Sequence, residues 1–433
     1  MNYDVVAERM LNNGEPGLIW LENARKYSRM RHDEMDWKDI LVKGSNPCGE
    51  MSLESREMCN LVELFIQHHT NLDDFLETVR YAFLYAKTVT LYPSHWEETN
   101  QVMMRNRRIG TGISGVAQYL AEHSLNEFKI WLETAYDQIQ ILDKEFSKFF
   151  CIPLSIKTTT IKPSGTVSLI AGATAGMHYP IAQTYLRRVT LPINSPFVSM
   201  LKEANYVIVP SVYNPATSVV VEVPMTFEKN VRVQSDVTMW EQLNLAAFLQ
   251  EHWSDNQVSA TITFDKAREG PQIAQALDQY QYRLKGISFL PSTDTSTTYA
   301  ISGKVTEAMI DDDDDEHHGH IYENVIKSVK YDKNKDSTFI EFDAKYATKH
   351  LIEEILKHLQ NYVISHHHVN MNPVPPYEQM PIEPITRAEY EQRIAHLKPV
   401  QWLAAASDHE SSIDNVAMPD GIVFCDGDSC YRV

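Results

Sequence analysis

The stretch GSNPCGEMSLESREMCNL, residues 44–61, places a thiol and a carboxylate two positions apart in a loop that contains glycine and proline. Cys48 is followed by Glu50, and a second cysteine, Cys59, lies eleven positions after the first. A carboxylate beside a thiol raises the pKa of the thiol, because the two negative charges repel each other. Thiolate chemistry is therefore disfavoured. Hydrogen-atom chemistry, with a neutral sulfur radical and the carboxylate as base toward a substrate hydroxyl, is favoured.

The size and composition of the chain set limits on its class. At 433 residues it can form two or three domains, or one large α/β domain with additions. Five cysteines are too few, and odd in number, for the disulfide scaffold of a secreted protein. The N-terminal sequence MNYDVVAERM lacks the features of a signal peptide, and no stretch approaches the roughly 20 apolar residues of a membrane span. We expect a soluble cytoplasmic protein, and the net charge of −19 disfavours sequence-independent binding to duplex DNA.

Hydrophobic periodicity predicts a fold of the α/β class. Helices are expected within residues 1–43, over 71–90 with Asn71 as the N-cap, and near 114–149 and 238–253. Short β-branched runs predict strands at 167–172, 218–225, 258–264 and 286–291. Strands that alternate with helices of this length indicate βα units in a largely parallel arrangement.

The pattern breaks after Tyr299. Residues 301–376 contain the run DDDDDEHHGH, a helix expected near 346–362 and the run SHHHVNMNPVPP, and we interpret this block as an insertion or small subdomain. Its histidines could bind a divalent metal, but consecutive histidines rarely converge on one ion without a rigid frame. A solvated charge run is favoured, and we predict no metal ligands.

Two glycine-containing motifs are candidates for phosphate binding. RIGTGISG, residues 108–115, has the glycine spacing of a dinucleotide fingerprint but no apolar strand before it, which favours tight packing at a strand-to-helix turn. KTTTIKPSGTVSLIAGATAG, residues 157–176, offers hydroxyls and a close backbone approach to an anion, with Lys157 and Lys162 nearby. On these residues alone an ordinary turn remains an open alternative for the second motif.

The chain ends in a cysteine pair. Cys425 and Cys430 lie five positions apart in FCDGDSCYRV, with Gly427 between them. Such a pair can close a small disulfide, and on a flexible tail it can travel between an interior site and an external reductant. Redox shuttling is favoured over two unremarkable surface thiols. The remaining cysteine, Cys151, is expected in the core.

Together these motifs resemble the ribonucleotide reductases. NPCGE at 46–50 with CNL at 59–61 is similar to the finger-loop active site of that family. RNRRIGTGISGVAQ, IKPSGTVSLIAGATAGMH, DNQVSATITFDKAREG and the terminal cysteine pair resemble its monomeric, adenosylcobalamin-dependent (class II) ribonucleoside triphosphate reductases. The resemblance runs from about residue 10 to 300 and resumes near Tyr377. As a combined pattern it is highly specific.

The resemblance implies a role for each motif. Cys48 would be the transient thiyl radical that takes the ribose 3′ hydrogen, Glu50 would accept the 3′ hydroxyl proton, and Asn46 would bind the sugar hydroxyls. Cys59 would be one of two thiols that reduce the 2′ position. The substrate phosphates would be bound by Ser164, Gly165, Thr166, Val167 and Ser168. Cys425 with Cys430 would re-reduce the active-site disulfide and be recharged by thioredoxin or a similar protein.

The fold implied is the second half of a ten-stranded α/β barrel with a central finger loop. The division of the chain is then a helical lead-in (1–43), the finger loop and following segment (44–65), the half-barrel (66–300), the insertion (301–376), the end of the barrel region (377–402) and a flexible redox-active tail (403–433).

Family members pair the counterpart of Cys59 with a cysteine well upstream of the finger loop, and no cysteine precedes Cys48 here. We therefore expect a split reductase whose N-terminal half, with the missing cysteine and the usual effector site, is a separate chain. Two alternatives stay open: a radical drawn from a separate metal-containing subunit, and a non-catalytic remnant that binds nucleotides or a partner.

Overall fold

The computed structural model describes most of the chain in two compact units. The described residues are 3–31, 35–227, 230–292, 298–302, 326–332, 337–342, 352, 355–356, 369–373, 379–400, 423–426 and 429–432. The first unit comprises Met1–Pro210, Asn214–Pro291 and Ile382–Val433, and the second comprises Ser211–Tyr213 and Ser292–Pro381.

The first unit contains two pairs of parallel strands joined by single bridges. β4 (Leu61–Phe65) pairs in parallel with β5 (Gly110–Ser114), and β9 (Thr261–Phe264) pairs in parallel with β10 (Gly286–Pro291). Two parallel bridges, Thr111 to Thr159 and Ile161 to Val258, join these pairs through residues 159–161. β1 (Leu18–Ile19) adds to β10 in the antiparallel direction. The predicted α/β class is confirmed.

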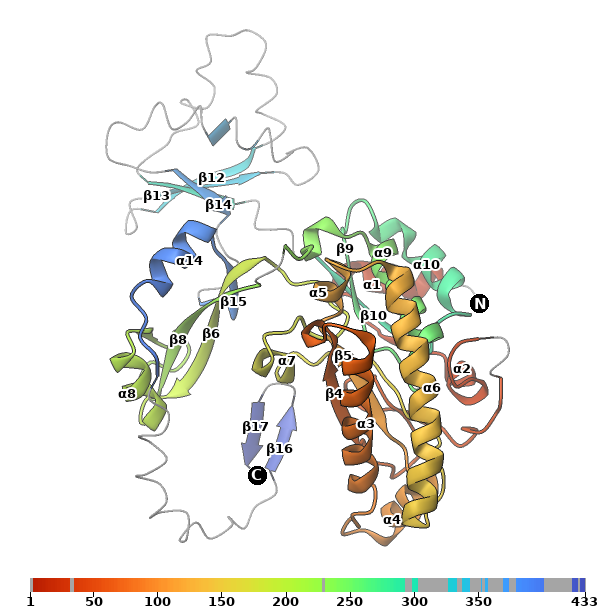
Figure 1. The fold of residues 1–433 in the computed structure, drawn as a ribbon. Helices are drawn as coiled ribbons and strands as arrows, with labels where there is room; N and C mark the ends of the chain where they lie inside the picture. The colour runs from red at the N-terminus through yellow and green to blue at the C-terminus, as the bar shows by residue number, and fades with distance from the viewer. Residues whose placement is uncertain are drawn as a thin grey trace. The chain divides into compact units, whose positions relative to one another are not determined.

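Long amphipathic helices cover these strands. α3 (Leu72–Val89) begins where predicted, because Asn71 Oδ1 accepts a hydrogen bond of 3.0 Å from the backbone N–H of Asp74. It lies beside α6 (Leu125–Phe150), with Phe75 stacked on Trp131 across the pair (Figure 1). The helix predicted near 238–253 is α9 (Met239–His252). The other helices of this part are α1 (Asp4–Asn13), α2 (Leu21–Lys26), α4 (Glu97–Asn106), α5 (Val116–Leu120) and α10 (Ile273–Tyr280), with short 3₁₀ turns at Ile66–His68, Gln234–Asp236 and Gly270–Gln272.

A second sheet in this unit is wholly antiparallel, which corrects the expectation of parallel pairing for residues 218–225. Its order is β15–β6–β8–β7, formed by Ile382–Pro384, Thr184–Pro192, Ser218–Thr226 and Val207–Pro210. Arg188 on β6 forms an ion pair of 2.8 Å with Glu222, which lies directly opposite on β8. The helices that accompany it are α8 (Pro196–Glu203) and α14 (Arg387–Ile394). The β-branched run 218–225 has the composition of a strand in either kind of sheet, so composition alone did not reveal its partners.

The run VSLIAG at 167–172 is not a strand. Residues 167–170 form one helical turn, α7 (Val167–Ile170), which is stabilised by a hydrogen bond of 3.1 Å from Ser168 N–H to the Ser164 carbonyl. The local turn chemistry of PSGT therefore overrides the β-branched composition that follows it.

The second unit contains a four-stranded antiparallel sheet of order β12–β13–β11–β14. Its strands are Ile326–Asp332, Ser337–Phe342, Thr298–Ser302 and Val369–Pro373. The acidic and histidine run, the second histidine run and most of the predicted helix near 346–362 lie outside the described residues. Within the predicted tail the structure describes one hairpin, β16 (Val423–Asp426) and β17 (Ser429–Arg432).

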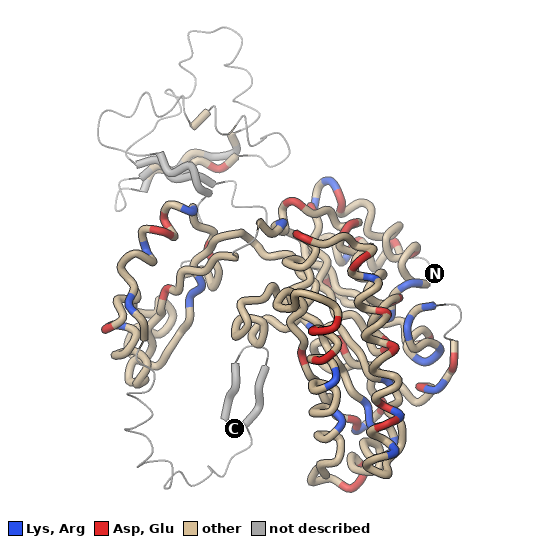
Figure 2. The backbone as a smooth tube through the Cα atoms, viewed as in Figure 1, with Lys and Arg blue, Asp and Glu red and all other residues tan. Residues whose placement is uncertain are grey.

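Basic and acidic residues alternate along the first unit, as Figure 2 shows for α6. In the described part of the chain, no helix has the length and apolar content needed to cross a bilayer.

Gly14 fixes how α1 lies against β10. Its φ is +87°, and a Cβ there would lie 2.1 Å from the backbone oxygen of Phe289. We expect Gly14→Ala to destabilise the first unit by at least about 2 kcal/mol, because it combines left-handed strain with backbone overlap. Gly44→Ala, which meets no atom within 4 Å, is the matched control. Urea unfolding followed by tryptophan fluorescence would measure the difference, and equal midpoints for the two variants would contradict it.

Candidate active site

Residues 44–53 form a small hairpin that carries the first cysteine. β2 (Gly44–Ser45) pairs in the antiparallel direction with β3 (Ser52–Leu53), and residues 46–51 turn between them. Asn46 Oδ1 accepts a hydrogen bond of 2.9 Å from Met51 N–H, and the Asn46 carbonyl accepts one of 3.0 Å from Gly49 N–H. Gly49 has φ +79°, a conformation that glycine adopts without strain. We call residues 44–53 the Cys48 hairpin.

The tip of the Cys48 hairpin is tied to the segments beside the parallel strands. The hydroxyl of Ser259 donates to the carbonyl of Cys48. The Glu50 carbonyl accepts from the hydroxyl of Thr160 at 2.6 Å and from Gln257 N–H at 3.0 Å. These bonds hold the backbone on both sides of Gly49, so the thiol and the carboxylate project from a fixed frame.

Glu50 is fully buried and only half partnered. Its Oε1 lies 3.2 Å from Lys162 Nζ, while its Oε2 is buried without a hydrogen-bond partner among the described residues. Leaving a buried acceptor unsatisfied costs about 1–3 kcal/mol, so such an atom points to a missing donor. A substrate hydroxyl is a donor of the right kind.

Cys48 and Cys59 lie within the electrostatic reach of this pair. Both cysteines are exposed as residues, whereas Glu50 is not. The chain around the Cys59 sulfur removes part of its water, and the negative charge of Glu50 adds to this effect, so the pKa of Cys59 rises to about 11. Burial alone would lower the pKa of Lys162, but Glu50 outweighs it and the pKa is raised. The site thus holds Cys59 as a neutral thiol and Lys162 as a cation.

The predicted phosphate-binding residues form one continuous loop. Ser164 has φ +54° and is buried, Gly165 and Thr166 are exposed, and Ser168 begins the buried side of α7. A Cβ on Gly165 would meet nothing within 4 Å, so the loop leaves open space in front of it. We call residues 164–168 the phosphate loop. Its first residue follows Lys162 by two positions, which places the loop beside Glu50.

Glu63 is a site residue that sequence reasoning missed. It projects from β4, and its Oε1 accepts hydrogen bonds from the hydroxyls of Ser114 and Ser164, the latter at 2.7 Å. A Cβ on Gly112, the register partner of Glu63, would lie 2.1 Å from Glu63 Oε2, so a larger residue at position 112 would displace the carboxyl group. The available signal was an acidic residue inside an otherwise apolar strand, LVELF, which needs a partner if it is buried.

Two sequence interpretations need correction. Lys157 does not supply charge to the phosphate loop, because it is fully buried and bonds Asp39 at 2.9 Å and the Ala24 carbonyl at 2.7 Å. Cys151 is not a core residue but an exposed one, at the left-handed C-terminus of α6 with φ +56°. RIGTGISG is a strand followed by a helix, and its Gly115, with φ +82°, makes the turn between them.

The terminal cysteines lie on the two neighbouring strands of the last hairpin. Cys425 on β16 is the register partner of Cys430 on β17. Directly opposite residues of an antiparallel pair have Cα atoms about 4.5–5.5 Å apart, and a disulfide needs about 4.4–6.8 Å. The backbone therefore places this pair at disulfide distance.

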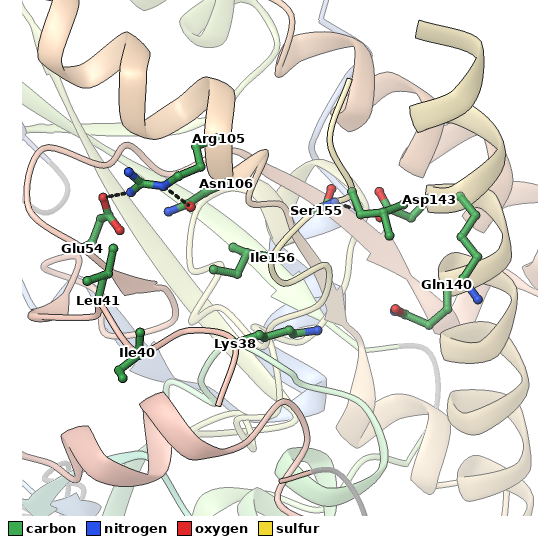
Figure 3. A pocket seen from close by; sticks show the side chains of 12 residues that line it. Lys38, Ile40, Leu41, Glu54, Arg105, Asn106, Gln140, Asp143, Ser155 and Ile156 are labelled. Carbon is green, nitrogen blue, oxygen red and sulfur yellow. Dashed lines mark hydrogen bonds and ion pairs between the residues drawn. The ribbon is translucent and has the colours of Figure 1, made fainter. Parts of the chain in front are cut away.

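A cavity of about 490 Å³ lies elsewhere in the first unit (Figure 3). Lys38, Leu41, Arg105, Gln140 and Asp143 are among the residues that line it. Three of its charged groups already have partners, because Arg105 bonds Glu54 and Asp143 bonds Lys87 at 2.6 Å. None of the predicted site residues lines it, so it does not contribute to the candidate site.

The effect of the Glu50 carboxylate on Cys59 can be measured as a change in the alkylation rate of Cys59. We expect Glu50→Gln to lower the pKa of Cys59, because it removes the main negative charge near the sulfur, and to speed alkylation of Cys59 several-fold at about pH 9. Mass spectrometry of the Cys59 peptide after timed iodoacetamide treatment would measure this. Glu77→Gln on the exposed face of α3 is the control. An unchanged rate in Glu50→Gln would show that Glu50 does not act on this thiol.

The chain is similar to known proteins of one family. The family described as "Ribonucleotide reductase, barrel domain" matches residues 3–126. A probable adenosylcobalamin-dependent ribonucleoside-triphosphate reductase of Dictyostelium discoideum is 51% identical over 298 residues, which cover 69% of this chain and 39% of that protein. The adenosylcobalamin-dependent ribonucleoside-triphosphate reductase of Euglena gracilis is 50% identical over 291 residues, covering 67% of this chain and 40% of that protein.

A solved structure described as a B-12 dependent (class II) ribonucleotide reductase aligns with a TM-score of 0.67 and 25% identity, over 96% of this chain and 50% of that one. The chain thus spans about 40% of the length of these curated relatives. The matched residues include the Cys48 hairpin, β4 and β5. From these matches and the parallel strands, we conclude that the chain belongs to the ribonucleotide reductase family and contains the second half of its α/β barrel.

Proposed function

We propose that this chain is the catalytic C-terminal part of an adenosylcobalamin-dependent ribonucleoside-triphosphate reductase, which replaces the ribose 2′ hydroxyl by hydrogen through thiyl-radical chemistry. The observation that carries the proposal is the buried Oε2 of Glu50, which has no hydrogen-bond partner in the described part of the chain and lies two residues from an exposed thiol. A ribose 3′ hydroxyl would supply that partner, and its C–H bond would then lie within reach of the sulfur.

The first step divides between two side chains. As a radical, Cys48 takes the 3′ hydrogen atom, and Glu50 accepts the proton of the 3′ hydroxyl. Lys162 Nζ lies 3.2 Å from Glu50 Oε1, so this cation fixes the position of the carboxyl group that accepts the proton. Asn46 uses its Oδ1 to hold Met51, and its Nδ2 donates to no described residue, so we assign this amide nitrogen to the sugar hydroxyls.

The second step is a two-electron reduction. The 2′ hydroxyl leaves as water, two thiols give up one hydrogen each and join as a disulfide, and Cys48 returns the 3′ hydrogen. Cys59 is one of these thiols, and its raised pKa keeps it protonated, as a hydrogen donor must be. The phosphate loop holds the triphosphate through backbone N–H groups and the exposed hydroxyl of Thr166.

Adenosylcobalamin, when bound, supplies the radical chemistry that activates Cys48. The residues present fit such a group, because the thiol lies at the exposed tip of the Cys48 hairpin and next to the exposed Pro47. These two residues would face the cofactor. The protein contributes the positioning of the sulfur and the exclusion of water from the buried Glu50.

We propose further that the second thiol and the first half of the barrel come from a separate N-terminal polypeptide, and that thioredoxin or a similar protein recharges the Cys425 and Cys430 pair. For the second thiol, the proposal is supported by the exposed position of Cys151 at the end of α6, which is not among the residues of the candidate site. For the Cys425 and Cys430 pair, it is supported by the register of the terminal hairpin. Thiol exchange of this kind belongs in a reducing compartment, which fits the cytoplasm.

The test is deoxynucleotide formation by the full chain mixed with its complementary polypeptide. We expect activity that depends on adenosylcobalamin and is abolished by Cys48→Ser, because the serine hydroxyl cannot replace the cysteine sulfur in the hydrogen transfer. Cys151→Ser is the matched control and should keep activity. Turnover without adenosylcobalamin would favour a separate metal-containing radical subunit. Full activity of this chain alone would contradict the split enzyme. Nucleotide binding without any turnover would favour the non-catalytic alternative.

The terminal cysteines are expected to be needed for repeated turnover but not for a single turnover. We expect Cys425→Ser or Cys430→Ser to leave about one product per pre-reduced site and to stop cycling with thioredoxin, because the active-site disulfide can then no longer be exchanged. Rapid-quench product counting, with thioredoxin and with a small dithiol, would measure this. If either variant cycles with thioredoxin at the normal rate, the shuttle assignment is wrong.

A further inference from the structure

Glu63 connects the phosphate loop to the parallel strands. Its Oε1 accepts a hydrogen bond from Ser164, the first residue of the loop, and another from Ser114, at the end of β5. Ser114 Oγ in turn accepts a bond of 3.1 Å from Gly176 N–H, which belongs to the segment that follows the loop. One carboxyl group thus holds the beginning of the loop and, through Ser114, its return path.

This placement has an electrostatic cost. The phosphate loop is proposed to bind a polyanion, yet the group behind its first residue is a carboxyl. The charged groups that act on Glu63 are Lys162, which favours its ionised form, and Glu50, which opposes it. Burial is the largest influence, so the pKa of Glu63 is raised to about 7 despite the two serine hydroxyls and Lys162, which lower it.

We propose that Glu63 is a positioning residue for the phosphate loop and that its carboxyl takes up a proton from solvent when a nucleoside triphosphate binds. This inference rests on the proposed function of the loop. It assigns to the site a proton-linked recognition of the substrate charge, separate from the proton transfer to Glu50.

The direction follows from charge repulsion. A bound triphosphate adds negative charge beside the loop and disfavours the ionised form of Glu63, so the pKa of Glu63 rises further on binding. Proton uptake is then greatest between the pKa values of the free and bound states and vanishes well below and well above them. Affinity falls as pH rises through this interval, about tenfold for each unit by which binding raises the pKa.

The neutral carboxyl keeps its positioning role. A protonated Glu63 still offers an oxygen to both serine hydroxyls, so the loop stays attached to β4 and β5 while the charge disappears. The hydroxyl of Ser164 is directed at Glu63, and Ser164 is 3% exposed. The exposed members of the loop, Gly165 and Thr166, are therefore the ones left to meet the phosphates.

Calorimetry of a nonhydrolysable triphosphate with the full chain, in buffers of different ionisation enthalpy from about pH 6 to 9, measures the uptake directly. We expect wild type to take up a fraction of a proton and Glu63→Gln to take up less by that fraction. Glu63→Gln keeps an acceptor oxygen but cannot ionise, so its comparison with wild type cancels the protonation of the ligand itself. Its affinity should exceed that of wild type by about tenfold or more at the alkaline end, if binding raises the pKa by one unit or more.

Two further variants keep the inference falsifiable. Ser114→Ala removes a hydrogen bond that stabilises the ionised form, so it should move the pH of maximal uptake upward. Glu77→Gln on α3 should behave as wild type. Uptake that persists unchanged in Glu63→Gln, or binding by wild type with no more uptake than Glu63→Gln, overturns this inference alone. Absence of triphosphate binding at every pH overturns the proposed function with it.

Discussion

The position of the Cys48 hairpin depends on one buried guanidinium group. Arg108, two residues before β5, bonds Asp39 on one side of the hairpin at 2.7 Å and Glu57 on the other at 2.8 Å, and all three are buried. Burial alone would raise the pKa of Asp39, but Lys157 and Arg108 outweigh it and lower the pKa well below its ordinary value. Buried ion pairs add little net stability, yet loss of one partner costs about 3–5 kcal/mol. The cluster therefore selects one placement of the hairpin against others.

The candidate active site also relies on one charged group that acts on several neighbours. Lys162 is the cation paired with Glu50, and it also acts on Cys59 and Glu63. The two carboxyl groups differ in their contacts: Glu50 is buried and its Oε2 has no hydrogen-bond partner among the described residues, whereas Glu63 is half-buried and accepts from both serines through the same oxygen. Burial costs free energy in both cases, and the fixed neighbours make it tolerable. A site of this kind is organised before the substrate arrives, which is what a reaction controlled by positioning requires.

Local signals predicted what depends on local physics. The N-cap at Asn71 and the periodicity after it predicted α3, and the capping threonine before Met239 accompanies α9. The strand predicted at 167–172 was wrong because the local turn chemistry of the preceding residues formed a helical turn. Other predictions failed where the outcome depended on distant partners, as for the run at 218–225, which became an antiparallel strand. Lys157 and Cys151 were misplaced for the same reason, because burial of a single side chain is not encoded in its neighbours along the chain.

The sequence by itself indicated the family, and it carries the residues from which the chemistry is proposed: a thiol and an acid two residues apart, a second thiol eleven residues from the first, a serine- and glycine-containing loop and a terminal cysteine pair. Tertiary structure decided how these groups act on one another. Glu50 lies 112 residues from Lys162 in the chain, and Glu63 lies 101 residues from Ser164. Those contacts form only when β4, β5 and the phosphate loop are brought together, because the free energy of burying a charge depends on which groups surround it in space.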